Sequence, residues 1–124
     1  MPGEVIDTSL LGAIVFGEPR AEEAFSLIRG KELYAPSLLA YELAGVARKK
    51  ARLYPNQQEK LVQALELALA LDIHWMEVDH VAVFRLAMTT GLTTYDASYL
   101  YLARFLALPL ATFDERLRTA TDSS

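Results

Sequence analysis

The chain has 124 residues, of which 52% are hydrophobic and 23% are charged, and it contains no cysteine. This composition is typical of one globular domain, which we expect to span residues 1–124, and it excludes a disordered chain. Without cysteine there is no disulfide framework, no zinc–thiolate site and no cysteine nucleophile. The formal net charge of −4 argues against binding of nucleic acid through a broad basic surface.

The N-terminal region carries no sign of a secretory signal. Residues 1–4 lack a basic start, and Asp7 interrupts the apolar run that follows. No segment reaches the roughly 18 apolar residues that a membrane-spanning helix needs. We therefore expect a cytoplasmic protein, and the lack of cysteine is compatible with that reducing compartment.

Short β-like runs alternate with helical runs along the chain. In chain order, the pattern predicts a strand at 4–7, helices at 8–16 and 19–30, a strand at 32–35, helices at 36–52 and from 55 onwards, a strand at 73–78, helices at 79–91 and 95–107, a strand at 108–112 and a short helix after residue 114. Pro19 and Asp79 are typical of helix starts, and Gly30 and Gly91 of helix ends. Strands separated by helices require right-handed crossovers, so we expect an α/β fold with a parallel sheet covered on both faces.

Four acidic residues occupy positions that matter in such a sheet, because its functional site lies beyond the carboxyl ends of the strands. Asp7 follows the first predicted strand, and Asp114 follows the last. Asp96 lies in the first turn of the penultimate helix, and Glu42 lies inside the third helix. These four are the candidate site residues.

Each of these carboxylates also has a structural explanation. The three aspartates lie at or near helix starts, where a carboxylate caps free N–H groups and stabilises the helix by about 0.5–2 kcal/mol. Glu42 falls on the same side of its helix as Leu38 and Val46, where an unpaired charge is costly to bury. A cation one further turn along, such as Lys49, is an alternative partner for it.

The four carboxylates are more informative together than singly. Gathered at one crevice they would repel one another unless cations lay between them. Oxygen ligands of this kind favour Mg²⁺ or Mn²⁺. Zinc fits poorly, because the chain has no cysteine and His74 and His80 are poorly placed as ligands.

Four motifs that contain these residues resemble the conserved motifs of PIN domains, in the family's order and across nearly the whole chain. They are Val-Ile-Asp-Thr-Ser at 5–9, Pro-Ser-Leu-Leu-Ala-Tyr-Glu at 36–42, the segment 94–103 with its Asp-Ala pair, and Leu-Ala-Thr-Phe-Asp-Glu-Arg-Leu at 110–117. Each motif is short, and it is the ordered set of four that is specific. The resemblance is strongest to the VapC toxins of prokaryotic toxin–antitoxin pairs.

The resemblance implies a PIN-like sandwich, in which a central, mostly parallel sheet of four to five strands has helices on both faces. It also implies an endoribonuclease that depends on one or two Mg²⁺ or Mn²⁺ ions and leaves a 3′-hydroxyl and a 5′-phosphate. A homodimer and inhibition by a cognate antitoxin protein are implied as well.

The motif positions carry the family's site over to this chain residue by residue. Asp7, Glu42, Asp96 and Asp114 become the catalytic residues and metal ligands. Supporting roles fall to Thr112, which would orient Asp114 or a bound water, and to Thr8 or Ser9 beside Asp7. Glu115 leaves a fifth carboxylate ligand in doubt, because it follows Asp114 directly.

Clustered cations offset the acidic net charge in this interpretation. Arg48 and Lys49 follow Glu42 on the same helix, and Arg116 follows Asp114, so these three are candidate contacts for RNA phosphates. The alternative for each is a solvated helix end, where a cation favours the helix dipole.

The mechanism expected from this site is in-line attack on an RNA phosphodiester by a metal-activated water. Bound Mg²⁺ would polarise the scissile phosphate and lower the pKa of that water, so no side-chain nucleophile is required.

Other readings remain. A different metal-dependent phosphoesterase or a DNA nuclease could use the same ligands. An aspartyl-phosphate enzyme would want a carboxylate where Ser9 stands. A non-catalytic, receiver-like interaction module would want a lysine after the last strand, and no lysine follows Thr112.

Overall fold

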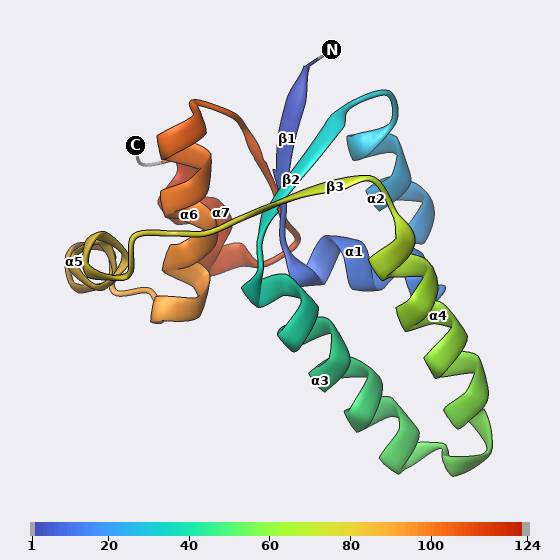
Figure 1. Ribbon diagram of the computed structural model, residues 1–124. Helices are drawn as coiled ribbons and strands as arrows, with labels where there is room; N and C mark the ends of the chain where they lie inside the picture. The colour runs from blue at the N-terminus through green and yellow to red at the C-terminus, as the bar shows by residue number, and fades with distance from the viewer. Residues whose placement is uncertain (1, 123–124) are drawn as a thin grey trace.

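Four parallel strands in the order β3-β2-β1-β4 form the centre of the fold in the computed structural model, which describes residues 2–122 (Figure 1). The strands are β1 (Gly3–Ile6), β2 (Glu32–Pro36), β3 (Ile73–Met76) and β4 (Leu110–Ala111). All the pairings between neighbouring strands are parallel. The predicted α/β fold with a parallel sheet is therefore confirmed, and the described part of the sheet has four strands.

Seven α-helices within residues 2–122 connect and cover these strands. They are α1 (Thr8–Val15), α2 (Ala21–Ile28), α3 (Leu38–Leu53), α4 (Gln58–Ala70), α5 (His80–Thr90), α6 (Thr94–Leu106) and α7 (Glu115–Asp122). Side-chain caps define several starts, because the Asp79 carboxylate accepts from the Ala82 N–H at 3.0 Å and the Thr93 hydroxyl accepts from the Asp96 N–H at 3.1 Å. Gly91, with φ of 77°, ends α5 in the left-handed conformation, as predicted.

Two helices begin later than predicted, because each is preceded by a tight turn at a proline. α2 begins at Ala21 and not at Pro19, since residues 18–21 form a turn closed by a 2.9 Å hydrogen bond from the Ala21 N–H to the Glu18 carbonyl. A 3₁₀ turn, η1 (Pro55–Gln57), likewise precedes α4. Proline favours the first positions of such turns because its φ angle is already fixed.

The last strand is also shorter than predicted. Ala107 adopts the left-handed conformation with φ of 55°, which ends α6. Pro109 has no N–H to donate to a neighbouring strand, although its carbonyl accepts from the Val5 N–H at 2.9 Å. The regular part of β4 is therefore Leu110–Ala111, which is enough to pair it with β1.

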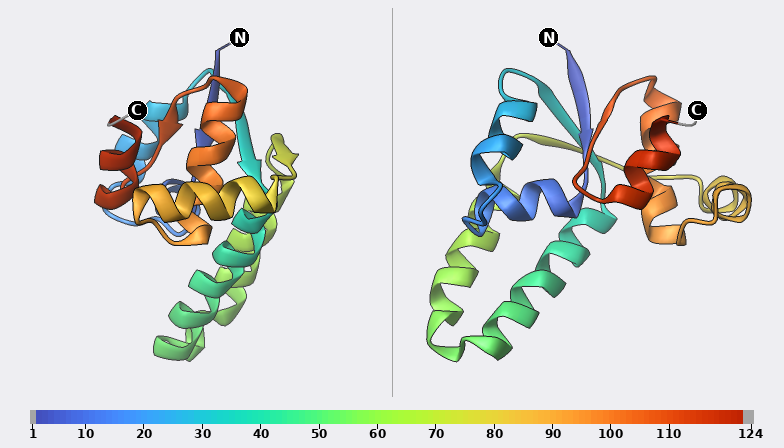
Figure 2. Two further views of the ribbon diagram at one scale, coloured as in Figure 1. Left: turned by 90° about the vertical axis from the view of Figure 1, so that its left-hand side faces the viewer. Right: turned by 180° about the vertical axis from the view of Figure 1, so that it is seen from behind.

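Helices cover both faces of the sheet (Figures 1 and 2). One face carries α1, α2 and α4, and the other carries α6 and α7, with α5 packed on the outer side of α6. The pair α3–α4 forms a long hairpin that extends past the end of the sheet. None of the helices within residues 2–122 combines the length and the apolar character needed to cross a bilayer.

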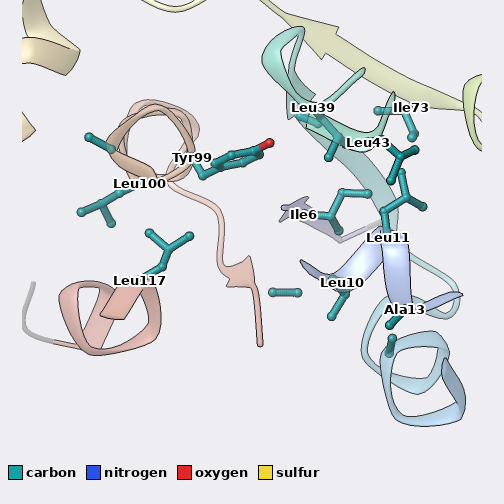
Figure 3. Packing of buried hydrophobic residues seen from close by; sticks show 14 of the residues in the cluster. Ile6, Leu10, Leu11, Ala13, Leu39, Leu43, Ile73, Tyr99, Leu100 and Leu117 are labelled. Carbon is teal, nitrogen blue, oxygen red and sulfur yellow. The ribbon is translucent and has the colours of Figure 1, made fainter. Parts of the chain in front are cut away.

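Buried aliphatic side chains from both faces hold the layers together (Figure 3). Leu10, Leu39 and Leu43 are fully buried and belong to the same core cluster as Leu117 of α7. Burying one such side chain contributes about 1.5–3 kcal/mol. Figure 3 also shows that the Tyr99 ring reaches from α6 into this core, with its hydroxyl at the far end.

The strand order determines where a ligand site can form. The chain builds β1, β2 and β3 outward in one direction and then returns to place β4 on the other side of β1. Where the winding direction reverses, the connections leave β1 and β4 on opposite faces and open a crevice at their carboxyl ends. The candidate residues Asp7 and Asp114 stand at this crevice.

Candidate active site

Asp7 is buried at the carboxyl end of β1, with 5% of its surface exposed. Its Oδ1 accepts hydrogen bonds from the Ser9 hydroxyl at 2.8 Å and from the Leu10 N–H at 3.1 Å. Its Oδ2 accepts a 2.5 Å hydrogen bond from the Thr112 hydroxyl. Asp7 is thus the N-cap of α1 and not the last residue of the strand, and groups from both ends of the chain hold its carboxylate.

Asp114 stands at the start of α7, directly across the crevice. Its Oδ1 accepts from the Leu117 N–H at 2.9 Å, and its own N–H donates to the Thr112 hydroxyl oxygen at 2.9 Å. Thr112 therefore bonds to the side chain of Asp7 and to the backbone of Asp114 through one hydroxyl group. That hydroxyl was expected to orient Asp114 or a water, and its shortest hydrogen bond is to Asp7.

Glu42 points from α3 toward α1 and α6. Its Oε1 accepts hydrogen bonds from the Thr8 hydroxyl at 2.8 Å and from the Tyr99 hydroxyl at 2.5 Å. The alternative pairing with Lys49 is wrong, because within the described residues no ion pair joins the two. Of the two hydroxyls predicted to support Asp7, only that of Ser9 does so, whereas Thr8 serves Glu42.

Asp96 is partly buried in the first turn of α6. Burial is the main cause that raises its pKa above the ordinary value, followed by the negative charges of Asp114 and Glu42. The positive charge of Arg116 and a hydrogen bond with Thr93 act in the opposite direction. These interactions show that Asp96 lies within the electrostatic reach of two of the other candidate carboxylates.

The pKa of Asp7 is likewise raised, chiefly by burial and also by the charge of Asp114. The hydrogen bonds from Thr112, Ser9 and the Leu10 N–H offset part of this effect because they stabilise the charged form. Carboxylates that are buried or half-buried and repel one another are typical of functional sites, and a cation would relieve the repulsion.

The donor set fits a hard divalent cation, since it consists of carboxylate and hydroxyl oxygens. However, no three His, Asp or Glu side chains within residues 2–122 are close enough together to be the ligands of one metal ion. The expectation that four carboxylates converge within a few ångströms is therefore not met. Mg²⁺ commonly binds through one or two carboxylates and keeps several of its waters, so a looser arrangement still suits it.

Comparison with known proteins identifies the family. The model of the PIN domain matches residues 5–122. This chain belongs to the PIN-domain family. It is 33% identical over 118 residues to Ribonuclease VapC3 of Pyrobaculum aerophilum, an alignment that covers 91% of this chain and 90% of that protein.

Solved structures of PIN proteins have the same architecture. PAE2754 from Pyrobaculum aerophilum matches with a TM-score of 0.80 at 29% identity, over 99% of this chain and 82% of that one. The VapC20 toxin of Mycobacterium tuberculosis, described as cleaving the sarcin-ricin loop, matches with a TM-score of 0.70 at 16% identity, over 95% of both chains. This second likeness shows the fold alone.

The cations predicted to contact RNA lie at different places relative to the four candidate carboxylates. Arg116 acts electrostatically on Asp96, and its guanidinium donates to the Gly91 carbonyl at 3.3 Å. Arg48 instead lines a hollow between α3 and α4, and none of the four candidate carboxylates lines that hollow. Lys49 is exposed on α3.

Tyr99 is the residue of this PIN domain that the sequence interpretation missed. Its ring was expected to belong to the core or to a dimer face, and it is 1% exposed, but its hydroxyl contacts Glu42 and Thr8. The signal for it was the spacing of three residues from Asp96, which places both side chains on one face of α6.

Proposed function

We propose that this PIN domain is a divalent-metal-dependent endoribonuclease and the toxin of a VapBC-like toxin–antitoxin pair. The observation that carries the proposal is the buried carboxylate of Asp7 at the β1–β4 crevice, whose pKa is raised by burial and by the charge of Asp114. The identity of 33% to a protein named Ribonuclease VapC3 supports the same activity. The cognate antitoxin, a homodimer and a cytoplasmic location belong to the proposal through the likeness to VapC proteins.

The four candidate carboxylates would share the ion or ions, each ion taking one or two of them as ligands and water for the rest, with Asp7 and Asp114 on the strand side and Asp96 and Glu42 on the helix side. When bound, Mg²⁺ or Mn²⁺ would supply positive charge that stabilises the transition state at the phosphate, and it would lower the pKa of a water so that this water becomes a nucleophile for in-line attack. The protein itself needs no nucleophile, which agrees with a crevice of carboxylates and hydroxyls.

The hydroxyl groups around the carboxylates serve as positioning groups. Ser9 and Thr112 hold the two oxygens of Asp7, and Thr8 and Tyr99 hold one oxygen of Glu42. The carboxylates of Asp7 and Glu42 therefore keep a fixed orientation before an ion arrives. Hydrogen bonds of this charge-assisted kind are short and strong. The remaining lone pairs are available to a cation or to its waters.

The test is cleavage of total cellular RNA by purified protein freed of any bound partner. Parallel reactions contain Mg²⁺, Mn²⁺ or EDTA, and the key variant is Asp96→Asn. Asp72→Asn is the matched control, because Asp72 is an exposed aspartate between α4 and β3. We expect cleavage with either metal, none in EDTA and none by Asp96→Asn, with normal cleavage by the control.

The opposite results have distinct meanings. If Asp96→Asn cut RNA normally, the carboxylate site would be wrong. If the wild-type protein cut no RNA and calorimetry detected no binding of Mg²⁺ or Mn²⁺, the non-catalytic interaction module would replace the nuclease.

A further inference from the structure

We infer that the surface formed by α5, α6 and α7 is a track for single-stranded RNA that leads away from the carboxylate crevice. The inference rests on the proposed nuclease function and adds the path of the substrate. The track consists of Arg116, Arg104, Arg85 and Phe105, which we call the arginine track. Figure 2, left, shows the side of the molecule on which these three helices lie.

Two adjoining hollows form the floor of the track. The first, of about 700 Å³, lies between the end of α5, α6 and α7 and is lined by Arg104 and Arg116. The second, of about 500 Å³, lies between α5 and α6 and is lined by Arg85, Arg104 and Phe105. Because Arg104 and Thr89 line both hollows, the two are continuous at this point.

The arginines of the track carry charge that is not neutralised by ion pairs. None of Arg85, Arg104 and Arg116 forms an ion pair with another residue in the described range 2–122. The acidic side chain that lines the first hollow, Glu115, lies 3.9 Å from the Arg118 guanidinium, which offsets part of its charge. No acidic residue lines the second hollow. Guanidinium groups stay charged at all physiological pH values, and phosphate is the anion that their planar donors match best.

The track begins at the carboxylates. Arg116 is two residues beyond Asp114, and its hydrogen bond to the Gly91 carbonyl holds it across the turn between α5 and α6. Its positive charge also acts on Asp96. Arg104 lies eight residues beyond Asp96 on α6, which is about 12 Å along the helix axis at roughly 1.5 Å per residue. A strand with one phosphate at the crevice could therefore place its neighbouring phosphates along these arginines.

Phe105 supplies the second ingredient of single-strand binding, an aromatic platform. Its side chain is 69% exposed, and its ring stacks on that of Tyr101 with centroids 5.9 Å apart and planes at 15°. The second ring supports the first from one side and leaves the other side to a base. A cationic groove with exposed aromatic rings is the usual combination in proteins that bind single strands, where bases of any identity stack on the rings.

The apolar stripe of α5 is a separate surface. Its exposed residues Val81, Phe84 and Met88 line neither hollow. On a helix with 100° per residue these three fall on one side, whereas Ala82, Leu86 and Thr89 face the second hollow. The track therefore combines arginines with apolar and aromatic side chains such as Leu86 and Tyr101, and it lies beside the apolar stripe of α5 without including it.

The experiment measures binding of fluorescently labelled single-stranded RNA to the whole chain in EDTA, which prevents cleavage. One probe has about 12 nucleotides and the other about 4, and both lengths lie within the roughly 4–16 nucleotides that a single-strand-binding fold occupies. We expect the wild-type protein to bind the longer probe more tightly, because only this probe is long enough to span both hollows of the track.

The variants are Arg104→Gln and Phe105→Ala, with Arg52→Gln as the matched control. The logarithm of the association constant falls as the logarithm of the salt concentration rises. For the longer probe, Arg104→Gln should make this slope shallower by about 0.7, as the loss of one phosphate contact requires. Phe105→Ala should weaken binding of that probe roughly five-fold or more, as the loss of one stacked base requires. Both effects should be smaller for the short probe, which spans only one of the two hollows at a time. Arg52 is exposed in the last turn of α3 and lines neither hollow, so Arg52→Gln should change nothing.

The track and the nuclease can fail separately. If wild-type protein cleaves RNA with Mg²⁺ but Arg104→Gln and Phe105→Ala bind the longer probe like the wild type, the track is wrong and the nuclease stands. The track is also overturned if the wild type binds both probes equally. The variants are also compared with the wild type by light scattering. If they changed the oligomeric state without changing the affinity for RNA, this surface would be one where copies of the chain contact each other, and the proposal would be overturned.

Discussion

The hydroxyl of Tyr99 on α6 donates a 2.5 Å hydrogen bond to the carboxylate of Glu42 on α3, across 57 residues of sequence. Thr8 donates to the same carboxylate oxygen, so three elements meet at one atom. Glu42 is half-buried, and a carboxylate in such a place without hydrogen-bond partners would be unfavourable. This contact therefore lets the core accommodate a carboxylate beside the crevice.

Replacing Tyr99 by phenylalanine should leave the ring packed and remove only the hydroxyl. Because the lost hydrogen bond is to a carboxylate, we expect the free energy of unfolding to fall by about 1.5–3 kcal/mol. Urea denaturation in EDTA measures this. Tyr101→Phe is the control, since within the described chain no hydrogen bond is seen for the hydroxyl of that half-buried tyrosine. Equal stability of the two variants would show that Glu42 does not depend on Tyr99.

Thr112→Val should alter the pH dependence of cleavage. The Thr112 hydroxyl lowers the pKa of Asp7 against the effect of burial, so its loss should raise that pKa further. The acidic limb of the kcat/KM profile should then move to higher pH, because Asp7 must be ionised to bind the cation. Thr112→Ser keeps a hydroxyl and should move the limb little. An unchanged limb in the valine variant would exclude this role.

Several elements were readable from sequence because local chemistry determines them. Asp79 and Gly91 mark the two ends of α5 through a side-chain cap and a left-handed residue, and both interactions involve only near neighbours. The early turns at Pro19 and Pro55 were harder, since proline suits the first turn of a helix and a tight turn equally well. Only the hydrogen bonds of the folded chain distinguish the two.

The contacts between distant elements could not be read in the same way. A helical stripe containing Tyr99 predicts that the ring is buried, but not which group its hydroxyl meets on another helix. The sequence therefore offers a partner for Glu42 only along its own helix, at Lys49. Likewise, alternating strands and helices predict a parallel sheet but not the order β3-β2-β1-β4. That order is what brings Thr112 beside Asp7.

Asp96→Asn should stabilise the protein in the absence of metal. Burial and neighbouring charges raise the pKa of Asp96 in the folded state, so its ionisation opposes folding at every pH above its unfolded value of about 3.8. This penalty grows as the pH rises through the window between the unfolded and the folded pKa, and it is absent in the asparagine variant. Thermal melts in EDTA should show a higher Tm for Asp96→Asn at neutral pH and no difference at low pH.

Added Mg²⁺ gives the complementary result. It should raise the Tm of the wild-type protein, because an ion that binds only the folded state stabilises it. The same concentration should have a smaller effect on Asp96→Asn. If Mg²⁺ shifted both proteins equally, Asp96 would not be a ligand.

Leu117→Ala should detach α7 from the core. Leu117 is fully buried, and its truncation leaves a cavity that costs about 2–5 kcal/mol. Leu67→Ala on α4 is the matched control, because that side chain is 59% exposed and its loss should change stability little. Calorimetry compares the two. Similar melting temperatures would mean that α7 contributes little to the fold.

The pairing of β4 with β1 has a consequence for how the protein is made. Asp7 and Glu42 precede β3 in the sequence, whereas Asp96 and Asp114 follow it, and at the centre of the sheet β1 pairs with β4, the last of the four described strands in chain order. A nascent chain can form β1, β2 and β3, since these pair in the order in which they are synthesised, yet it holds only half of the carboxylates. Any activity that needs all four carboxylates therefore requires the chain to be synthesised at least as far as β4 and Asp114.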